Sequence, residues 1–231
     1  MNDTFGTRSW VALFFALFAA KAALGQDTPG PVEKAPPPSP PYLNSAPENS
    51  AWTISFEIAN GKPAPKDIKE IDVTKSGDAR HEISIANDGT TSEAWFFKGV
   101  KLIFDKNAGY AVASDRYQNA VKPPSQAELD FLDFIDAAAS NFAGRTTMAG
   151  HICYYYRPRS EYGVYELWID MKTGLPVAER NDFRGVPLTQ VYKFTSGGEA
   201  ARTLPPAYLA AYQLHEKQAD RARLIQAVLT R

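Results

Sequence analysis

The residues that carry most protein catalysis are few in this chain and lie far apart. There is one cysteine, Cys153, and there are three histidines: His81, His151 and His215. His151 and Cys153 are two residues apart, so they share a face if the segment is a strand. A nucleophile and its base need a third group that orients the base, and the sequence supplies no candidate for it. We therefore read Cys153 as a buried, inert side chain.

Two acidic residues, Glu166 and Asp170, share a strand face in the same way. Paired carboxylates hydrolyse glycosides only across a cleft, which a short strand does not provide. The chain also lacks the Gly-x-Ser-x-Gly, His-Glu-x-x-His, phosphate-loop and dinucleotide-binding patterns. One cysteine excludes an intramolecular disulfide, and three histidines leave little material for zinc. We predict that the protein is not an enzyme and binds no metal or cofactor.

Composition and charge narrow the choice of partners. The 231 residues contain 44% hydrophobic residues, typical of a globular chain. The 25 basic and 26 acidic residues give a net charge of −1, so no basic surface favours nucleic acid. The partners to consider are apolar small molecules, lipids and proteins.

The first 25 residues resemble a secretory signal peptide. The apolar run 11–20 is shorter than a membrane span needs. Small residues at Ala23 and Gly25 predict cleavage before Gln26. Lys21 is unusual this close to a cleavage site, which keeps an uncleaved N-terminal anchor as the alternative. The prediction is a periplasmic or secreted protein, near a membrane if the N-terminus is retained.

A proline-rich segment follows at 26–50 and contains eight of the 17 prolines. Such a segment stays extended and packs poorly. We predict a linker that tethers the folded part, with a docking site for a polyproline-binding partner as the alternative.

Period-2 alternation dominates the folded part, residues 51–200. In 51–58, Trp52, Ile54, Phe56 and Ile58 share one face, the pattern of a strand with one buried side. The same pattern recurs, with turn residues between, at 68–76, 81–86, 92–99, 100–105, 110–114, 146–157, 163–170, 174–182 and 188–194. This predicts a mainly β (α+β) fold, a curved antiparallel sheet or half-barrel.

Two helices interrupt or follow the strands. Ser125 and Glu128 form a capping box ahead of apolar residues at helical spacing, which predicts a central helix over 125–142 that ends near Gly144. Residues 201–231 begin with Pro205-Pro206 and continue as helix formers with an apolar stripe. This predicts a C-terminal amphipathic helix, which is also a candidate surface for a protein partner.

The segment 165–180, YELWIDMKTGLPVAER, gives the family resemblance. Asp170 is placed to accept hydrogen bonds from backbone amides across a turn. Gly174 can adopt a positive φ in that turn, and Pro176 can start the next strand. With Leu167, Trp168, Ile169, Thr173 and Leu175, they resemble the hairpin of the periplasmic outer-membrane lipoprotein-carrier (LolA-like) superfamily. The resemblance covers roughly 51–195. Such carriers usually begin with a helix, whereas here the strand at 51–58 follows the linker directly. The C-terminal helix of this chain extends past the point where such carriers usually end.

That resemblance implies a sheet that encloses an apolar cavity and carries an acyl chain or a lipoprotein. We accordingly predict a non-catalytic binding protein of the cell envelope, with its ligand between the concave sheet face and the central helix. The predicted ligand-binding residues are Phe131, Leu132 and Ile135 from the helix and Trp95, Phe97 and Trp168 from the sheet. Two alternatives remain: an envelope scaffold that uses the C-terminal helix, and a carbohydrate-binding module that stacks sugars on Trp95 or Trp168.

Overall fold

Six strands build the first half of the protein. The structure is a computed structural model that describes residues 28–58, 63–107, 109–115, 124–160, 163–183, 186–195 and 203–229; the predicted signal peptide and its cleavage site lie outside these residues. The strands are β1 (Asn49–Ile58), β2 (Ile68–Ser76), β3 (Ala79–Ala86), β4 (Thr91–Phe97), β5 (Val100–Asp105) and β6 (Tyr110–Asp115). They agree closely with the segments predicted from alternation.

The second half begins with a short helical region and returns to strands. The helix α2 (Gln126–Asp130) is followed by 3₁₀ turns at Leu132–Phe134 and Ala139–Asn141. The strands are β7 (Phe142–Met148), β8 (His151–Tyr156), β9 (Arg159–Ser160), β10 (Gly163–Asp170), β11 (Pro176–Phe183) and β12 (Val186–Thr195). A long C-terminal helix, α3 (Pro206–Leu229), ends the described chain.

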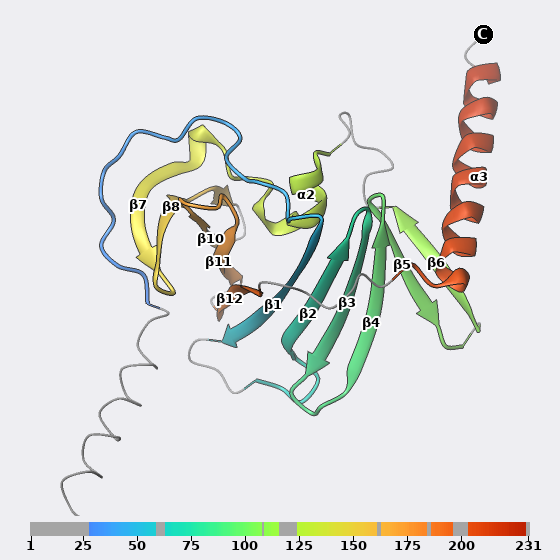
Figure 1. Ribbon diagram of the computed structural model, residues 1–231, viewed down its shortest axis with the longest axis horizontal. Coiled ribbons are helices and arrows are strands. Elements are labelled where there is room, and N and C mark those ends of the chain that lie inside the picture. Colours follow the sequence, from blue (N-terminus) through green and yellow to red (C-terminus); the bar gives the residue numbers. More distant parts are fainter. Residues whose placement is uncertain are drawn as a thin grey trace, which may run out of the picture.

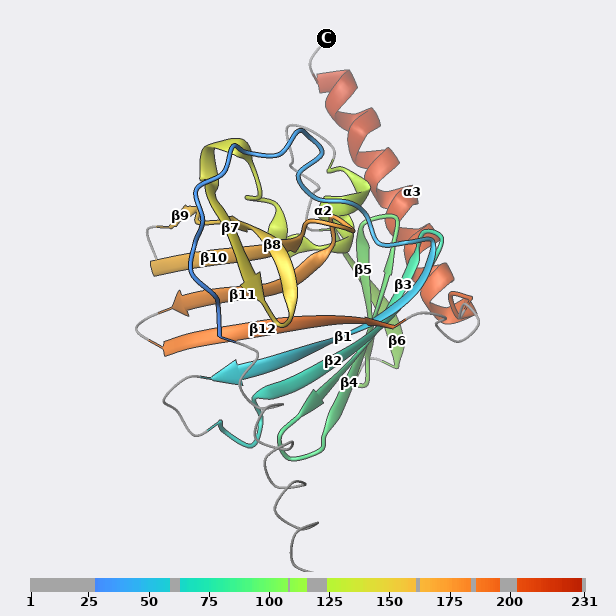
Figure 2. The ribbon, with the colours of Figure 1, turned by 60° about the vertical axis from the view of Figure 1, so that its left-hand side comes forward.

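All twelve strands belong to one antiparallel sheet, in the order β6-β5-β4-β3-β2-β1-β12-β11-β10-β8-β7, with β9 beside β10. The first strand, β1, therefore lies in the middle and joins the halves by pairing with both β2 and β12. The sheet is strongly curved, and β6 and β7 are its two end strands (Figures 1 and 2). The predicted fold class, an open curved antiparallel sheet with a packed helix and a C-terminal helix, is confirmed.

The prediction of one strand over 146–157 is wrong, because the segment contains a tight hairpin turn. Ala149 and Gly150 both adopt positive φ, 48° and 79°. Two consecutive residues of this kind make a turn that reverses the chain between paired strands. The segment thus supplies the end of β7 and all of β8.

The prediction of one helix over 125–142 is also wrong. The capping box of Ser125 and Glu128 is present, but α2 stops after Asp130. Arg80 Nη1 donates to the carbonyl oxygens of Leu129 and Asp130, both at 2.7 Å. In a longer helix these two carbonyls would accept from amides four residues on, so the arginine takes the bonds that would extend the helix. Gly144, predicted to stop the helix, lies inside β7 instead.

Apolar side chains fill both faces of the sheet. We call the side that α2 covers the α2 face and the other side the α3 face. The α2 face carries the largest cluster, in which Phe131 and Phe134 pack on Trp52, Val73, Tyr156, Leu167, Ile169 and Tyr192. The α3 face carries two smaller clusters, one below α3 and one around Trp168.

The proline-rich segment is extended, as predicted, but it is attached to the sheet. We call residues 28–48 the strap. It runs along the outside of β7 and then crosses to the start of β1 (Figures 1 and 2). Residues other than proline make its backbone hydrogen bonds to the sheet. Gly30 and Glu33 pair with β7, and the Asn44 amide donates to Gly174 O. Ala46, only 4% exposed, belongs to the core on the α2 face.

The helix α3 packs on the sheet only through its first turns. Tyr208, Ala211 and Tyr212 contact the cluster of β4 to β6, and beyond them the helix projects away from the sheet (Figure 1). Leu214 and Ile225 on the projecting part are 58% and 57% exposed. No helix in the described part of the chain combines the length and the apolar character that a membrane span requires.

Candidate functional site

Two of the predicted ligand-binding residues, Trp95 and Phe97, lie under α3. Trp95 is 2% exposed and packs between His81 and Tyr208, with ring centroids 4.3 and 6.0 Å away. Phe97 meets the ring of Tyr212 edge-on at 4.9 Å. These rings hold α3 on the sheet, and they face away from α2.

Trp168 also lies on the α3 face, at the other end of the sheet. It alternates with Leu167 and Ile169, which belong to the core of the α2 face. Its ring stacks on Tyr155 at 5.5 Å and is 1% exposed. Because Trp95 and Trp168 are both buried, neither ring offers a platform on which a sugar can stack.

The predicted ligand-binding residues of the central helix also differ in their surroundings. Phe131 is 2% exposed and packs against Trp52 and Phe194, whereas Ile135 is 54% exposed. The side chain of Leu132 lies outside the described part. The structure therefore does not bring the five residues with described side chains into one cavity, and aromatic rings fill the space between α2 and the sheet.

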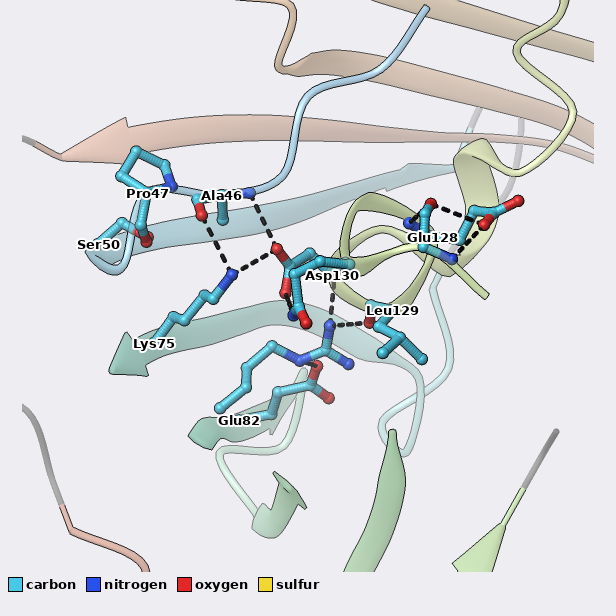
Figure 3. Close-up of polar contacts among 11 residues, drawn as sticks. Ala46, Pro47, Ser50, Lys75, Glu82, Glu128, Leu129 and Asp130 are labelled. Carbon is cyan, nitrogen blue, oxygen red and sulfur yellow. Dashed lines mark hydrogen bonds and ion pairs between the residues drawn. The ribbon is translucent and has the colours of Figure 1, made fainter. Parts of the chain in front are cut away.

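A buried ionic network joins the strap, α2 and the sheet (Figure 3). Lys75 Nζ on β2 lies 2.5 Å from Asp130 Oδ2, and the two side chains are 5% and 3% exposed. Both groups also bind Ala46: its amide donates to Asp130 Oδ2 at 2.9 Å, and its carbonyl accepts from Lys75 Nζ at 3.1 Å. Each charge is thus paired and hydrogen-bonded, as burial requires.

Arg80 on β3 extends this network, because it caps α2 and lies 3.1 Å from Glu82 through Nε. The cavity beside Arg80 has a volume of only about 30 Å³, roughly the space of one water molecule. The network is therefore a structural joint, and the space beside it is too small for an organic ligand.

A larger pocket lies where β11 begins and β12 ends. We call it the turn pocket; its volume is about 310 Å³, at the lower end of the usual range for small-molecule sites. Its apolar wall comes from Leu175, Pro176, Val177, Val191 and Phe194. Its polar residues include His151, Asp170 and Lys193. One pocket therefore offers an apolar wall with charged groups beside it.

The predicted turn of the hairpin positions the polar side of the turn pocket. Asp170 accepts from the Lys172 amide at 3.1 Å and from Thr173 Oγ1 at 2.9 Å, and Gly174 adopts a φ of 69°. His151 Nδ1 lies 3.6 Å from Asp170 Oδ2. The turn thus fixes the carboxylate, while the half-exposed imidazole can contact a ligand.

The geometry does not favour catalysis by Cys153. Burial raises the pKa of its thiol to about 12, and the charge of Asp170 adds to the effect. The thiolate, which is the nucleophilic form, is therefore scarce at neutral pH. Glu166 and Asp170 do not act as a pair, since Glu166 binds Tyr155 Oη and Arg180. In the described ranges no three His, Cys, Asp or Glu side chains gather as a metal site.

Sequence reasoning missed a buried carboxyl group on the α2 face. Glu179 is 3% exposed. Burial, with a smaller effect from the charge of Asp133, raises its pKa to about 9, although a hydrogen bond from Tyr165 opposes the shift. Glu179 is thus protonated at neutral pH. Two charged residues that follow it closely in the sequence, Arg180 and Asp182, hid its burial.

The fold defines a mainly β protein with an open, curved sheet, and the turn pocket is a cavity of the described part that has both apolar and charged walls. No family model matches the chain, and no curated protein matches it in sequence. Among solved structures, it is similar to the Mycobacterium tuberculosis lipoprotein LppX, at 11% identity and a TM-score of 0.37 over 84% of this chain and all of that one.

A second similar structure is MucB, solved in complex with MucA(peri), at 17% identity and a TM-score of 0.37. It matches 66% of this chain, which spans about half of the MucB chain, 52%. The weak resemblance predicted from residues 165–180 fits these neighbours. With both TM-scores below 0.5, neither likeness assigns a function to the chain.

Proposed function

We propose that the protein is a non-catalytic binding protein of the cell envelope that holds an amphiphilic ligand, such as an acyl chain with a polar head, in the turn pocket. The observation that carries the proposal is the composition of that pocket. An apolar wall favours a hydrocarbon group because its burial removes apolar surface from water. The charged groups beside it orient the head of the ligand.

The charged residues narrow the class of head group. Among the residues that line the pocket, the side chains of His151 and Lys193 can donate hydrogen bonds to a ligand, and that of Asp170 can accept them. Asp170 already accepts two bonds within its own turn, so the donors of His151 and Lys193 are the groups left for a ligand. A head group that accepts hydrogen bonds, such as a carboxylate or a phosphate ester, suits this arrangement.

The envelope location is part of the proposal and rests on residues 1–25. We expect export and cleavage before Gln26. Intact-mass measurement of the exported protein checks this expectation, and a mature chain that retains residues 10–20 would show an anchor instead.

Native mass spectrometry of the purified mature protein, followed by titration with a fluorescent fatty acid, tests the ligand proposal. Leu175→Trp fills the pocket, and we expect the Kd to rise at least tenfold. Leu214→Trp makes the same change on the exposed part of α3, so its Kd should stay within twofold of wild type. Equal affinities for both variants, or no bound lipid and no titration in wild type, would reject the proposal.

A scaffold role is the second candidate function, and the projecting part of α3 favours it. Its exposed Leu214 and Ile225 lie beyond the turns that pack on the sheet. Removing residues 216–231 distinguishes the two functions. A scaffold loses its partner on truncation, whereas a ligand-binding protein keeps its affinity for the fatty acid.

A further inference from the structure

The outer edge of β7 is closed by the strap. As an end strand of the sheet, β7 turns one row of amides and carbonyls away from β8, and such an edge pairs readily with another extended chain. Here Gly30 N donates to Thr147 O at 2.8 Å. Glu33 N donates to Arg145 O at 2.7 Å and Glu33 O accepts from Arg145 N at 2.9 Å.

The strap pairs poorly for its length. Pro29 and Pro31 have no amide hydrogen, and the two strap amides that donate to β7, those of Gly30 and Glu33, are three residues apart instead of two. Glu33 and Arg145 form a single isolated bridge, not a ladder. A pocket of about 250 Å³ remains between Pro31 and Glu33 on the strap and Thr147 and Ile152 on the sheet. An extended chain free of these prolines, which can keep a regular antiparallel register through this segment, would make more bonds to the same edge.

The edge has features that suit an incoming backbone. A side chain on Gly144 would lie 2.4 Å from Glu33 O, so the glycine leaves room for close approach. Arg145 Nη2 lies 3.6 Å from the carboxylate of Glu33, and the two side chains are 43% and 71% exposed. Ile152, 63% exposed, adds an apolar contact beside the pocket.

We propose that the edge of β7 is an acceptor site for an extended polypeptide segment of a partner protein, one that carries a carboxylate opposite Arg145, and that the strap is a built-in competitor for this site. The partner adds a strand to the sheet by backbone hydrogen bonds. The surface is separate from the turn pocket, so the inference goes beyond the proposed function.

The strap can leave β7 without unfolding the protein, because its other attachments lie further along the chain. Asn44 holds the turn at Gly174, and Ala46 holds the Lys75–Asp130 pair. Release of residues 28–37 leaves both in place. While attached, the strap acts at a high effective concentration, so a free peptide competes poorly in wild type.

The probes are three labelled peptides, with fluorescence anisotropy as the readout. The first, TPGPVEKAPP, copies residues 28–37. The second, TTGTVEKAPP, restores two amide donors, and the third, TTGTVKKAPP, reverses the charge opposite Arg145. In the full chain, Glu33→Pro removes the central bond of the strap. Lys34→Pro is the matched control, since the described hydrogen bonds include none from the Lys34 amide.

We expect the Arg145 amide to exchange faster in Glu33→Pro than in Lys34→Pro. The second peptide should bind Glu33→Pro at least tenfold more tightly than Lys34→Pro, and more tightly than the first peptide does. In the Glu33→Pro background, Arg145→Glu should weaken the second peptide about threefold and favour the third. Equal binding of the second peptide to both proline variants, or an Arg145 amide that stays slow in Glu33→Pro, would overturn the proposal.

Discussion

Gly174 and Gly89 both adopt positive φ, 69° and 82°, but only Gly174 has a close neighbour. A Cβ there would lie 2.4 Å from Asn44 Nδ2, which donates to Thr173 O. We expect Gly89→Ala to cost about 1 kcal/mol for the backbone alone. Gly174→Ala should cost about 1 kcal/mol more, because the hydrogen bond of Asn44 is lost. Urea unfolding measures both, and equal costs would show that Asn44 does not restrain the turn.

The buried carboxyl of Glu179 gives a pH dependence. Its pKa is about 9 in the folded protein and near the ordinary 4.5 when unfolded. Between these values the folded state holds a proton that the unfolded state has lost, so the free energy of unfolding falls as pH rises. The slope from this group is at most about 1.4 kcal/mol per pH unit.

Glu179→Gln mimics the protonated side chain at every pH, so we expect the variant to lose that slope. It should gain stability over wild type steadily from pH 5 to pH 8. Thermal unfolding across this range measures the difference, and the exposed Glu57→Gln is the matched control for loss of one carboxylate. Parallel stability curves for wild type and Glu179→Gln would contradict protonation of the buried group.

At the scale of the element, α3 divides into a docked part and a projecting part. Tyr208 packs against Trp95 and is 8% exposed. Tyr208→Ala should therefore lower the free energy of unfolding by about 3 kcal/mol, as for other buried aromatic side chains. Truncation after His215 removes a segment whose described side chains are exposed or partly exposed, so it should change the unfolding temperature by less than about 2 °C. A large loss on truncation would mean that the distal helix packs on the body of the protein.

Alternation predicted the strands well because the pattern is local: each strand buries every second side chain. The central helix was mispredicted because its length depends on a residue far away in the sequence. Ser125 and Glu128 correctly predicted where α2 starts. The helix ends where Arg80, 50 residues before Asp130 in the sequence, binds the carbonyl oxygen of Asp130. Likewise, prolines predicted an extended strap, but its bonds to β7 and to Lys75 come from partners that no local pattern reveals.

The predicted site failed to assemble for a reason that belongs to the whole sheet. Alternation shows that Trp95, Phe97 and Trp168 each lie on a buried face, but not on which of the two. That choice depends on register along the entire strand order, and the structure places all three on the face opposite to Phe131. The sequence predicted only one part of the turn pocket, the turn that holds Asp170.

At the scale of the molecule, Asp130 is the residue where strap, helix and sheet meet. Asp130→Asn removes its charge and leaves Lys75 buried without a counter-ion, which should cost about 3 to 5 kcal/mol. The control is the exposed pair Lys66–Asp88, 3.0 Å apart with Lys66 79% exposed, where Lys66→Met should cost below about 1 kcal/mol. Denaturant unfolding measures both. Similar costs would show that the network does not hold the three parts together.

The position of β1 between β2 and β12 has a consequence for how the chain folds. The residues paired across the β1–β12 seam are as many as 144 positions apart, as for Ala51 and Thr195. Contacts this distant in sequence slow folding, because a long loop must close before they form. During synthesis β1 can pair with β2 early, but its other edge stays open until β12 emerges. The strand β1, which lies at the centre of the finished sheet, is therefore an exposed, aggregation-prone edge strand in the partly synthesised chain.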